Sequence, residues 1–325
     1  MKLAVERWGI VFQNPVMLAA GTCGFGEELH EVADLEGLGG LVTKSVTLEP
    51  RLGNPSPRVA EIGMSMINSI GLANPGLDRV RSEKLPWMRE HLRRAKVFVS
   101  LAGRAPEEYL ALVEGLDGEE GFVGYELNLS CPNDSRMQRP FALDPDAVAE
   151  VVAGTRARTG RPLLVKLAPN DPDLGQTAQR AESAGADGLT LVNTLPGLAI
   201  DTDHRRAALG AGHGGISGPG LRGAGLLAVA TARRMTRLPL LGVGGIGSAS
   251  DALQYLFAGA FLVQVGTATF ADPRSAERIV RDLERWGQRN GVGSVEDLVG
   301  AGLPPPAPTE ATSPVGAPAG TRVEG

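Results

Sequence analysis

The sequence predicts an α/β protein that forms a single (β/α)8 TIM barrel with long loops at one rim. Short apolar runs alternate with helical patterns along the chain, which is typical of parallel βα units. There are eight such runs, each followed by a helical pattern, in a chain of 325 residues. A barrel of this kind needs roughly 250 residues, so one barrel accounts for most of the chain.

The predicted strands cover residues 16–20, 40–44, 97–101, 125–129, 163–167, 188–192, 240–243 and 261–265. The predicted helices cover residues 28–37, 78–94, 106–116, 145–158, 172–184, 219–235, 248–258 and 272–288. In such barrels the functional side chains lie at the carboxyl ends of the strands. We therefore expect the residues that follow each strand to gather around one pocket.

Two connections are longer than a barrel requires. They are residues 45–77, after the second strand, and residues 193–218, after the sixth. Long structured loops at this rim usually act as lids or binding loops. We expect the barrel to span residues 1–302, and we expect residues 303–325, which are rich in Pro, Ala and Gly, to be a disordered tail.

Composition and charge exclude several classes of function. The chain is 42% hydrophobic and 21% charged, as in globular proteins, and its net charge of −5 gives no reason to expect a nucleic-acid partner. No apolar run approaches the length of a membrane span, and no apolar signal core precedes Asn14, so we expect a cytoplasmic protein without a membrane anchor. Cys23 and Cys131 are too few for a disulfide framework or a four-thiolate cluster, and we predict no metal site.

The fourth predicted strand carries an unusual polar face. Alternation places Glu126, Asn128 and Ser130 on one side, and such side chains need a ligand or a charged neighbour when they are buried. Pro132 ends the strand, so Cys131 falls at the rim, where a thiol can act as a nucleophile, a metal ligand or a proton-transfer base. An ordinary cysteine is a small buried hydrophobe, but the polar face before Cys131 favours a functional thiol.

Two lysines lie within apolar strand runs. Lys44, followed by Ser45, ends the second strand, and Lys166 lies near the end of the fifth. Alternation allows both side chains to point into the barrel. Such a lysine can bind a phosphate or carboxylate, neutralise a reduced cofactor, or form a Schiff base. For Lys166 the structural alternative is that it only neutralises Glu126.

The remaining polar groups follow other strands. The first long loop carries Asn68-Ser69-Ile70-Gly71-Leu72, whose amides suit a small planar polar molecule, and the sixth strand ends in Asn193-Thr194. The last two strands end in Gly244-Gly245 and Gly266-Thr267. A glycine turn is a weak signal by itself, but glycines let the backbone approach a phosphate, and barrels commonly bind one here. Together with Gly218 they indicate a phosphorylated cofactor, for which FMN is the natural candidate.

A flavin oxidation fits these groups. A base takes a proton from one carbon of the substrate while hydride leaves the adjacent carbon, and Lys44 or Lys166 stabilises the anionic reduced flavin. Cys131 is the candidate base, because none of the four histidines lies at a strand end. The ordinary pKa of a thiol, about 8.5, predicts a rate that rises toward alkaline pH.

Several motifs together resemble the dihydroorotate dehydrogenases, over residues 14–273. They are Thr47-Leu48-Glu49-Pro50-Arg51-Leu52-Gly53-Asn54-Pro55, Asn68-Ser69-Ile70-Gly71-Leu72, Asn128-Leu129-Ser130-Cys131-Pro132-Asn133 and Gly244-Gly245-Ile246. The resemblance implies FMN-dependent oxidation of (S)-dihydroorotate to orotate in de novo pyrimidine (UMP) biosynthesis.

By the same resemblance, Cys131 corresponds to the catalytic base, with Lys44 as a second catalytic residue. The implied substrate ligands are Lys44, Asn68, Ser69, Ile70, Gly71, Leu72, Asn128, Asn133, Asn193 and Thr194. The implied cofactor contacts are Ala20, Gly21, Lys44, Ser45, Ser100, Asn128, Lys166, Val192, Gly218, Gly244, Gly245, Gly266 and Thr267. The chain departs from the family pattern at Ser100, where the family often has the longer side chain of Asn.

A cysteine base is similar to class 1 of the family, whereas class 2 enzymes use serine and carry an N-terminal anchor. Leu48-Glu49-Pro50-Arg51 and Ala73-Asn74-Pro75-Gly76 look most like type 1B. Type 1B implies a homodimer of this chain joined to a partner subunit in a heterotetramer. The partner carries FAD and a [2Fe-2S] cluster, through which electrons reach NAD.

Three alternatives stay open. A fumarate-dependent type 1A enzyme would have a similar barrel, as would a dihydropyrimidine dehydrogenase subunit, which reduces uracil or thymine. From a different class, a Schiff-base aldolase using Lys166 would also bind a phosphate, but the protein would be colourless.

Overall fold

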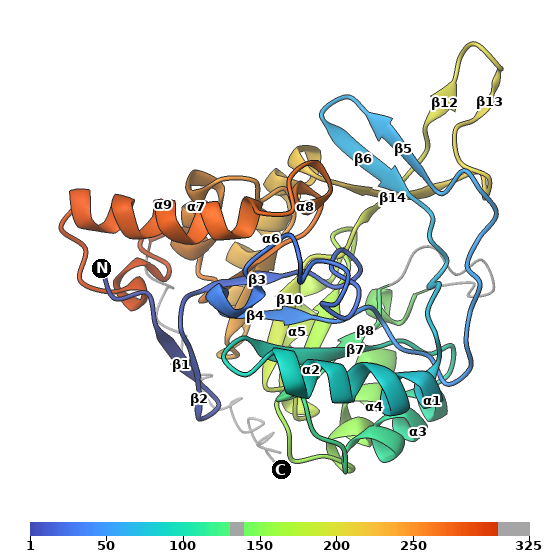
Figure 1. Cartoon of the computed structure of the whole chain (residues 1–325), viewed down its shortest axis with the longest axis horizontal. Coiled ribbons are helices and arrows are strands. Elements are labelled where there is room, and N and C mark those ends of the chain that lie inside the picture. Colours follow the sequence, from blue (N-terminus) through green and yellow to red (C-terminus); the bar gives the residue numbers. More distant parts are fainter. Residues whose placement is uncertain (131–139, 305–325) are drawn as a thin grey trace, which may run out of the picture.

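The eight predicted strands close into one parallel barrel in the structure, a computed structural model that describes residues 1–130 and 140–304. The barrel strands are β3 (Val16–Leu18), β4 (Gly40–Val42), β7 (Lys96–Leu101), β8 (Gly124–Asn128), β9 (Leu163–Leu167), β10 (Gly188–Leu191), β15 (Leu240–Val243) and β16 (Leu262–Val265). Each pairs in parallel with the next along the chain, and β16 pairs with β3 to close the barrel (Figure 1). The predicted (β/α)8 fold is therefore confirmed.

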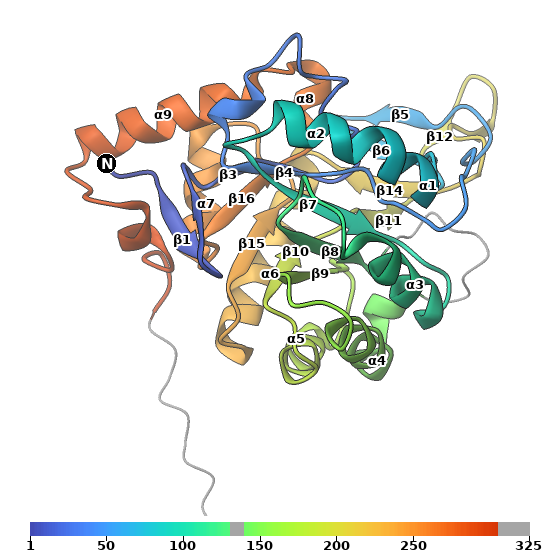
Figure 2. The ribbon, with the colours of Figure 1, turned by 60° about the horizontal axis from the view of Figure 1, so that its bottom comes forward.

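Helices surround the barrel (Figure 2). They are α1 (Leu77–Arg79), η2 (Val80–Lys84), α2 (Leu85–His91), α3 (Pro106–Leu116), α4 (Pro145–Arg156), α5 (Leu174–Ser183), α6 (Arg222–Met235), α7 (Ala249–Ala258), α8 (Ala268–Ala271) and α9 (Ser275–Arg289). Shorter 3-10 turns are η1 (Leu35–Gly37), η3 (Phe141–Leu143), η4 (Pro219–Leu221) and η5 (Val295–Leu298). Helix α4 shows why these segments are helical: the side chain of Asp144 accepts the first free N–H groups, and Val148, Val151 and Val152 form one buried stripe.

The helix predicted over residues 28–37 is wrong. Only η1 forms there, and it is preceded by turns in which Leu29 N–H bonds to Gly26 O and Val32 N–H to Leu29 O. Gly24 and Gly26 adopt left-handed φ angles of 55° and 100°. Because starting a helix is costly, the short run between these glycines and Gly37 does not continue as one.

An N-terminal hairpin that we did not predict closes the bottom of the barrel. Strands β1 (Val5–Arg7) and β2 (Ile10–Phe12) meet at a two-residue turn, where Trp8 and Gly9 both have positive φ angles, 57° and 71°. The Trp8 ring packs edge-on against Phe12, Phe98 and Phe261 at centroid distances of 6.3, 6.1 and 5.4 Å. This aromatic plug fills the amino-terminal end of the barrel and leaves the carboxyl end for a site.

The two long rim loops pair with each other. They form a four-stranded antiparallel sheet in the order β11-β14-β6-β5, which we call the lid sheet. Its strands are β5 (Val59–Ile62), β6 (Ser65–Asn68), β11 (Leu195–Gly197) and β14 (Gly214–Ser217), and a second hairpin, β12 (Ile200–Asp201) with β13 (Arg206–Ala207), extends beyond it (Figure 1). Because Asn68 pairs with Gly215, and Ile67 with Ile216, residues nearly 150 positions apart cover the same rim.

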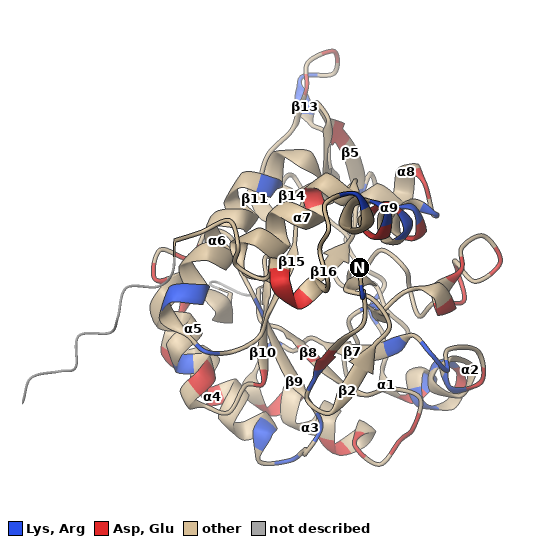
Figure 3. Cartoon of the chain, turned by 90° about the vertical axis from the view of Figure 1, so that its left-hand side faces the viewer, with Lys and Arg blue, Asp and Glu red and all other residues tan. Residues whose placement is uncertain are grey.

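The described surface carries charge of both signs. Acidic and basic residues are interspersed on the helices around the barrel (Figure 3). Across residues 1–130 and 140–304, the structure contains no helix with the length and apolarity needed to cross a membrane.

Candidate active site

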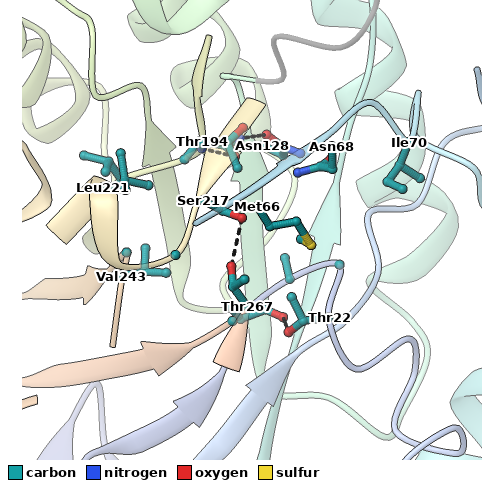
Figure 4. A pocket seen from close by; sticks show the side chains of 18 of the residues that line it. Thr22, Met66, Asn68, Ile70, Asn128, Thr194, Ser217, Leu221, Val243 and Thr267 are labelled. Carbon is teal, nitrogen blue, oxygen red and sulfur yellow. Dashed lines mark hydrogen bonds between the residues drawn. The ribbon is translucent and has the colours of Figure 1, made fainter. Parts of the chain in front are cut away.

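A pocket lies between the carboxyl ends of the barrel strands and the lid sheet (Figure 4). Its cavity volume is about 190 Å³, and its mouth is open to solvent. Its wall comes from residues at or beyond the ends of β3, β4, β8, β10, β15 and β16, from β9, and from lid strands β6 and β14. The expected gathering of strand ends around one pocket is therefore observed.

Most of the predicted site residues line this pocket. They are Ala20, Gly21, Lys44, Ser45, Asn68, Ile70, Gly71, Leu72, Asn128, Lys166, Val192, Asn193, Thr194, Gly218, Gly244, Gly245, Gly266 and Thr267. Cys131, Asn133 and residues 305–325 of the predicted tail lie outside the described residues. Two further predicted residues, Ser69 and Ser100, are buried but do not line the pocket.

Ser69 and Ser100 lie behind the pocket wall. Ser100 Oγ is 2.9 Å from Ser45 Oγ, and the Ser100 N–H donates to Thr43 Oγ1 at 3.1 Å. Ser69 Oγ accepts a hydrogen bond from Asn54 Nδ2 at 2.8 Å. Each serine therefore supports a residue or loop at the wall, and the short side chain of Ser100 is matched by its hydroxyl partner Ser45.

Three glycines form a backbone cradle at one side of the pocket. Gly218, Gly244 and Gly245 have φ angles of 90°, 127° and 69°, a region that other residues rarely adopt. A Cβ atom on Gly245 would lie 2.8 Å from the carbonyl oxygen of Gly218, so the two segments approach too closely for any side chain. Such a cradle exposes backbone to a ligand and is suited to a phosphate group.

An amide and hydroxyl network lies at the ends of β4, β8 and β10. Asn128 Nδ2 donates to Ser45 Oγ at 3.1 Å, and Asn193 Nδ2 donates to Asn128 Oδ1 at 3.1 Å and to Ser130 Oγ at 2.9 Å. The side chain of Asn193 also accepts from the Thr194 N–H at 2.8 Å. These bonds fix the orientation of the asparagines and orient the residue that precedes Cys131.

The two strand lysines both reach the pocket. Lys166 is only 5% exposed, and its Nζ lies 3.5 Å from Glu126 Oε1. Lys166 therefore contacts Glu126, which agrees with the alternative that it neutralises this carboxylate. It also lines the pocket. Lys44 lies next to Gly21, where an added Cβ would come 3.9 Å from Lys44 Nζ.

The sequence did not reveal several pocket residues. Met66 and Ser217 reach the pocket from the lid sheet, and Thr22 and Phe270 from segments after β3 and β16. Thr267 Oγ1 and Ser217 Oγ are 2.8 Å apart, which links the lid sheet to the end of β16 (Figure 4). Strand pairing between distant loops leaves no local pattern in the sequence. Of these residues, only Ser217 could have been expected at the pocket, because it precedes Gly218.

The other groups of possible chemical interest are structural. No three histidine, cysteine or carboxylate side chains come together as metal ligands would, within the ranges 1–130 and 140–304. Cys23 is fully buried with its Sγ 3.4 Å from the Val42 carbonyl oxygen, and burial raises the pKa of its thiol to about 12. A thiol in that position is inert under ordinary conditions.

A closed barrel whose carboxyl-end pocket combines a glycine cradle, lysines and ordered amides has the architecture of a (β/α)8-barrel enzyme. The family model described as "Dihydroorotate dehydrogenase" matches residues 2–286. The chain belongs to the dihydroorotate dehydrogenase family of oxidoreductases.

The relatives place the chain near one branch of this family. It is 44% identical over 299 residues to "Dihydroorotate dehydrogenase B (NAD(+)), catalytic subunit" of Geotalea daltonii, which covers 92% of this chain and 97% of the relative. A Solibacter usitatus relative, provisionally named dihydroorotate dehydrogenase A (fumarate), is also 44% identical, over 92% of this chain and 98% of its own. A dihydroorotate dehydrogenase from Eimeria tenella, solved with ferulenol, shares the fold with a TM-score of 0.78 at 24% identity, covering 92% and 88% of the two chains. The predicted likeness to a type 1B catalytic subunit is confirmed.

Proposed function

We propose that this chain is the catalytic subunit of a type 1B enzyme that oxidises (S)-dihydroorotate to orotate, with FMN as its cofactor, in de novo pyrimidine (UMP) biosynthesis. One observation carries the proposal: the glycine cradle, both strand lysines and the asparagine network line a single pocket in a chain of this family. The cradle fits a phosphate, and the lysines fit a group that becomes anionic on reduction.

The fit of FMN rests on the shape of the backbone. Gly218, Gly244 and Gly245 have positive φ angles, and a Cβ on Gly245 would collide with the Gly218 carbonyl oxygen, so glycine lets these backbone segments lie close together at the pocket wall. Lys166 enters the pocket from β9, and β10 lies between β9 and β15, the strand that leads into Gly244 and Gly245. A ligand with a phosphate at one end and a polar ring at the other could therefore contact both. When bound, FMN supplies the acceptor for hydride. Other implied contacts are Ala20, Gly21, Lys44, Ser45, Asn128, Val192, Gly266 and Thr267, with Ser100 supporting Ser45 from behind.

Cys131 is the proposed base. Its thiolate takes a proton from one carbon of dihydroorotate while hydride leaves the adjacent carbon. The support comes from the sequence, where Cys131 directly follows Ser130, and from the bond that holds the Ser130 hydroxyl against Asn193 at 2.9 Å. Lys44 contributes positive charge beside the reacting groups.

The asparagines are the proposed substrate ligands, because dihydroorotate presents a carboxylate and planar ring amides. An Asn side chain offers both donors and an acceptor, so Asn68, Asn128 and Asn193 can pair with ring amide groups. The other proposed ligands are Lys44, Ser69, Ile70, Gly71, Leu72, Asn133 and Thr194. Ser69 would act by holding this loop in place, since its side chain accepts from Asn54 and its N–H donates to the Arg58 carbonyl oxygen.

Electrons leave through a partner subunit in this proposal. The relative in Geotalea daltonii is named as the catalytic subunit of an NAD(+) enzyme, a name that implies another subunit. We propose that this partner carries FAD and a [2Fe-2S] cluster, passes electrons to NAD, and joins a homodimer of this chain in a cytoplasmic heterotetramer. The Solibacter usitatus relative keeps a fumarate-using type 1A enzyme as the second candidate.

The ion pair of Lys166 disfavours the hypothesis of a Schiff-base aldolase. A Schiff base forms from a neutral amine, whereas Lys166 is ion-paired with the fully buried Glu126. That pair uses the ammonium form of the lysine.

The test is an anaerobic titration of the purified, FMN-loaded chain. Dihydroorotate should bleach the flavin absorbance, while uracil, thymine and NADH should not in the absence of the partner. Reoxidation by fumarate would favour type 1A, and reoxidation by NAD only after addition of the partner subunit would favour type 1B. A yellow protein that dihydroorotate does not bleach would refute the substrate assignment. A protein that stays colourless after FMN addition would refute the cofactor assignment.

A further inference from the structure

We propose that Glu126 is a positioning residue that holds the ammonium group of Lys166 at the pocket floor, where it stabilises reduced FMN more than oxidised FMN. This inference rests on the proposed function, because it requires FMN in the pocket. It adds to that function a second residue, below the pocket, which acts on the cofactor only through Lys166.

The barrel itself places the two side chains one above the other. Lys166 pairs with Asn128 on β8 and with Thr190 on β10, so these residues form one row of the sheet. Glu126 precedes Asn128 by two positions on the same strand and therefore points inward one row lower. Lys166 lines the pocket, whereas Glu126 is 0% exposed and does not.

One oxygen of the Glu126 carboxylate is held by two neutral side chains. Its Oε2 accepts from Thr190 Oγ1 at 2.9 Å and from Gln264 Nε2 at 3.1 Å. Its Oε1 has no hydrogen-bond partner within the described residues and lies 3.5 Å from Lys166 Nζ. Two neutral donors thus hold one oxygen and present the other oxygen to the ammonium group.

The length of this contact is informative. At 3.5 Å it is an ion pair rather than a short hydrogen bond, so it attracts the ammonium without fully occupying its three N–H donors. Those donors stay available to an acceptor in the pocket. Glu126 therefore restrains Lys166 and still allows its ammonium group to donate hydrogen bonds to a ligand.

Stability does not explain the arrangement. A buried ion pair is often no more stabilising than apolar side chains of the same volume, because both charges lose their hydration. The rest of the barrel interior could be filled by apolar residues, as in other barrels of this fold. A charged pair that touches a cofactor pocket from below is better explained by its effect on the ligand's charge.

The sign of the change in the FMN midpoint potential follows from which of the two charges lies nearer to the pocket. The ammonium group is nearer to the pocket than the carboxylate, so a group that gains negative charge in the pocket is stabilised by the pair. Without the carboxylate, the ammonium group loses the ionic partner that holds it at the pocket floor. Reduced FMN then loses stabilisation, and the midpoint potential falls.

The first experiment measures the midpoint potential of FMN in the loaded protein and the FMN affinity of the stripped protein. In Glu126→Gln we expect the ratio of affinities for reduced and oxidised FMN to fall by about tenfold or more, equivalent to about 30 mV for a two-electron couple. Lys166→Met should lower the potential as well. In the double variant the Glu126→Gln change should add nothing to the shift caused by Lys166→Met, since Glu126 acts through that lysine.

Two further variants make the result decisive. Gln264→Met removes one hydrogen bond to Glu126 without changing charge, and it should give a smaller shift of the same sign that disappears in the Lys166→Met background. Glu27→Gln is the matched control, because Glu27 forms an ion pair with Lys84 and neither residue lines the pocket. It should leave the potential at the wild-type value.

The outcomes separate the two proposals. Wild-type protein that binds no FMN would overturn both. Wild-type protein that bleaches with dihydroorotate, while Glu126→Gln and Gln264→Met keep its potential, would overturn only the role of Glu126. A shift by Glu126→Gln that is equally large in the Lys166→Met background would show that Glu126 acts directly, against the inference.

Discussion

Replacing Gly245 by alanine should weaken both the fold and the binding of FMN. Gly245 has a φ angle of 69°, which costs a non-glycine residue about 1–2 kcal/mol. The new Cβ would lie 2.8 Å from the Gly218 carbonyl oxygen and 2.9 Å from Arg222 Cβ, so the backbone of the cradle must move. With that added strain we expect a loss of about 2–3 kcal/mol in the free energy of unfolding, seen as a melting temperature lower by about 5 °C.

A second effect should appear in the FMN dissociation constant. Displacing the cradle breaks at least one hydrogen bond to a charged phosphate, worth about 1.5–3 kcal/mol, so Kd should rise by about tenfold to a hundredfold. The assay is a titration of stripped protein with FMN, followed by the quenching of flavin fluorescence.

Gly247 provides a matched control two positions away. A Cβ there would meet nothing closer than Ala268 Cβ at 3.9 Å, and the Gly247 φ angle is not positive. Gly247→Ala should therefore keep the wild-type FMN affinity within about twofold. If Gly245→Ala and Gly247→Ala bound FMN equally well, the cradle would not be the phosphate site.

Four other outcomes follow from the site. Cys131→Ala should keep FMN but slow its reduction by dihydroorotate by orders of magnitude at neutral pH, as measured by anaerobic stopped flow; near-normal reduction would remove Cys131 from the mechanism. Because burial raises the pKa of Cys23 to about 12, iodoacetamide at pH 8 should leave Cys23 unmodified in the native protein, as peptide mass mapping would show, and should modify it after denaturation. Asn193→Ala removes hydrogen bonds to two other polar side chains, so kcat/KM for dihydroorotate should fall about tenfold or more, with FMN affinity little changed in the fluorescence titration. Ser100→Ala removes one neutral bond to Ser45, worth about 1 kcal/mol, so a rise in FMN Kd of more than about tenfold would show that Ser100 contacts the cofactor directly.

The barrel could be predicted because its signals are local. Each strand is a short apolar run, and strands that follow one another in the chain are neighbours in space. The N-terminal hairpin escaped prediction for the opposite reason: Trp8-Gly9 is an uncommon pair for a turn with two positive φ angles. Trp8 is held there by tertiary contacts, its ring against Phe261 and its Nε1 donating to the Asp187 carbonyl oxygen at 2.9 Å.

The residues of the candidate site also fall into those that a local sequence pattern predicts and those that it does not. Lys44, Asn128 and Lys166 were found because alternation along a strand decides which way a side chain points. Met66 and Ser217 were missed because they reach the pocket through the pairing of β6 with β14, which no local pattern encodes. Ser100 entered the site through the family resemblance alone, and in the structure its hydroxyl contacts Ser45 behind the pocket wall.

The pocket therefore contains parts that should respond separately to substitution. The cradle is made of backbone after β14 and β15, the Glu126–Lys166 pair belongs to β8 and β9, and Asn193 follows β10. A change in the cradle acts on the affinity for both oxidation states of FMN, whereas a change in the ion pair acts on the difference between them. A change at Asn193 should act on the substrate in our proposal, because its side-chain amide donates to Asn128 and Ser130. Affinity, potential and kcat/KM should thus report on three different sets of side chains and backbone groups, and this separation allows each assignment to fail without the others.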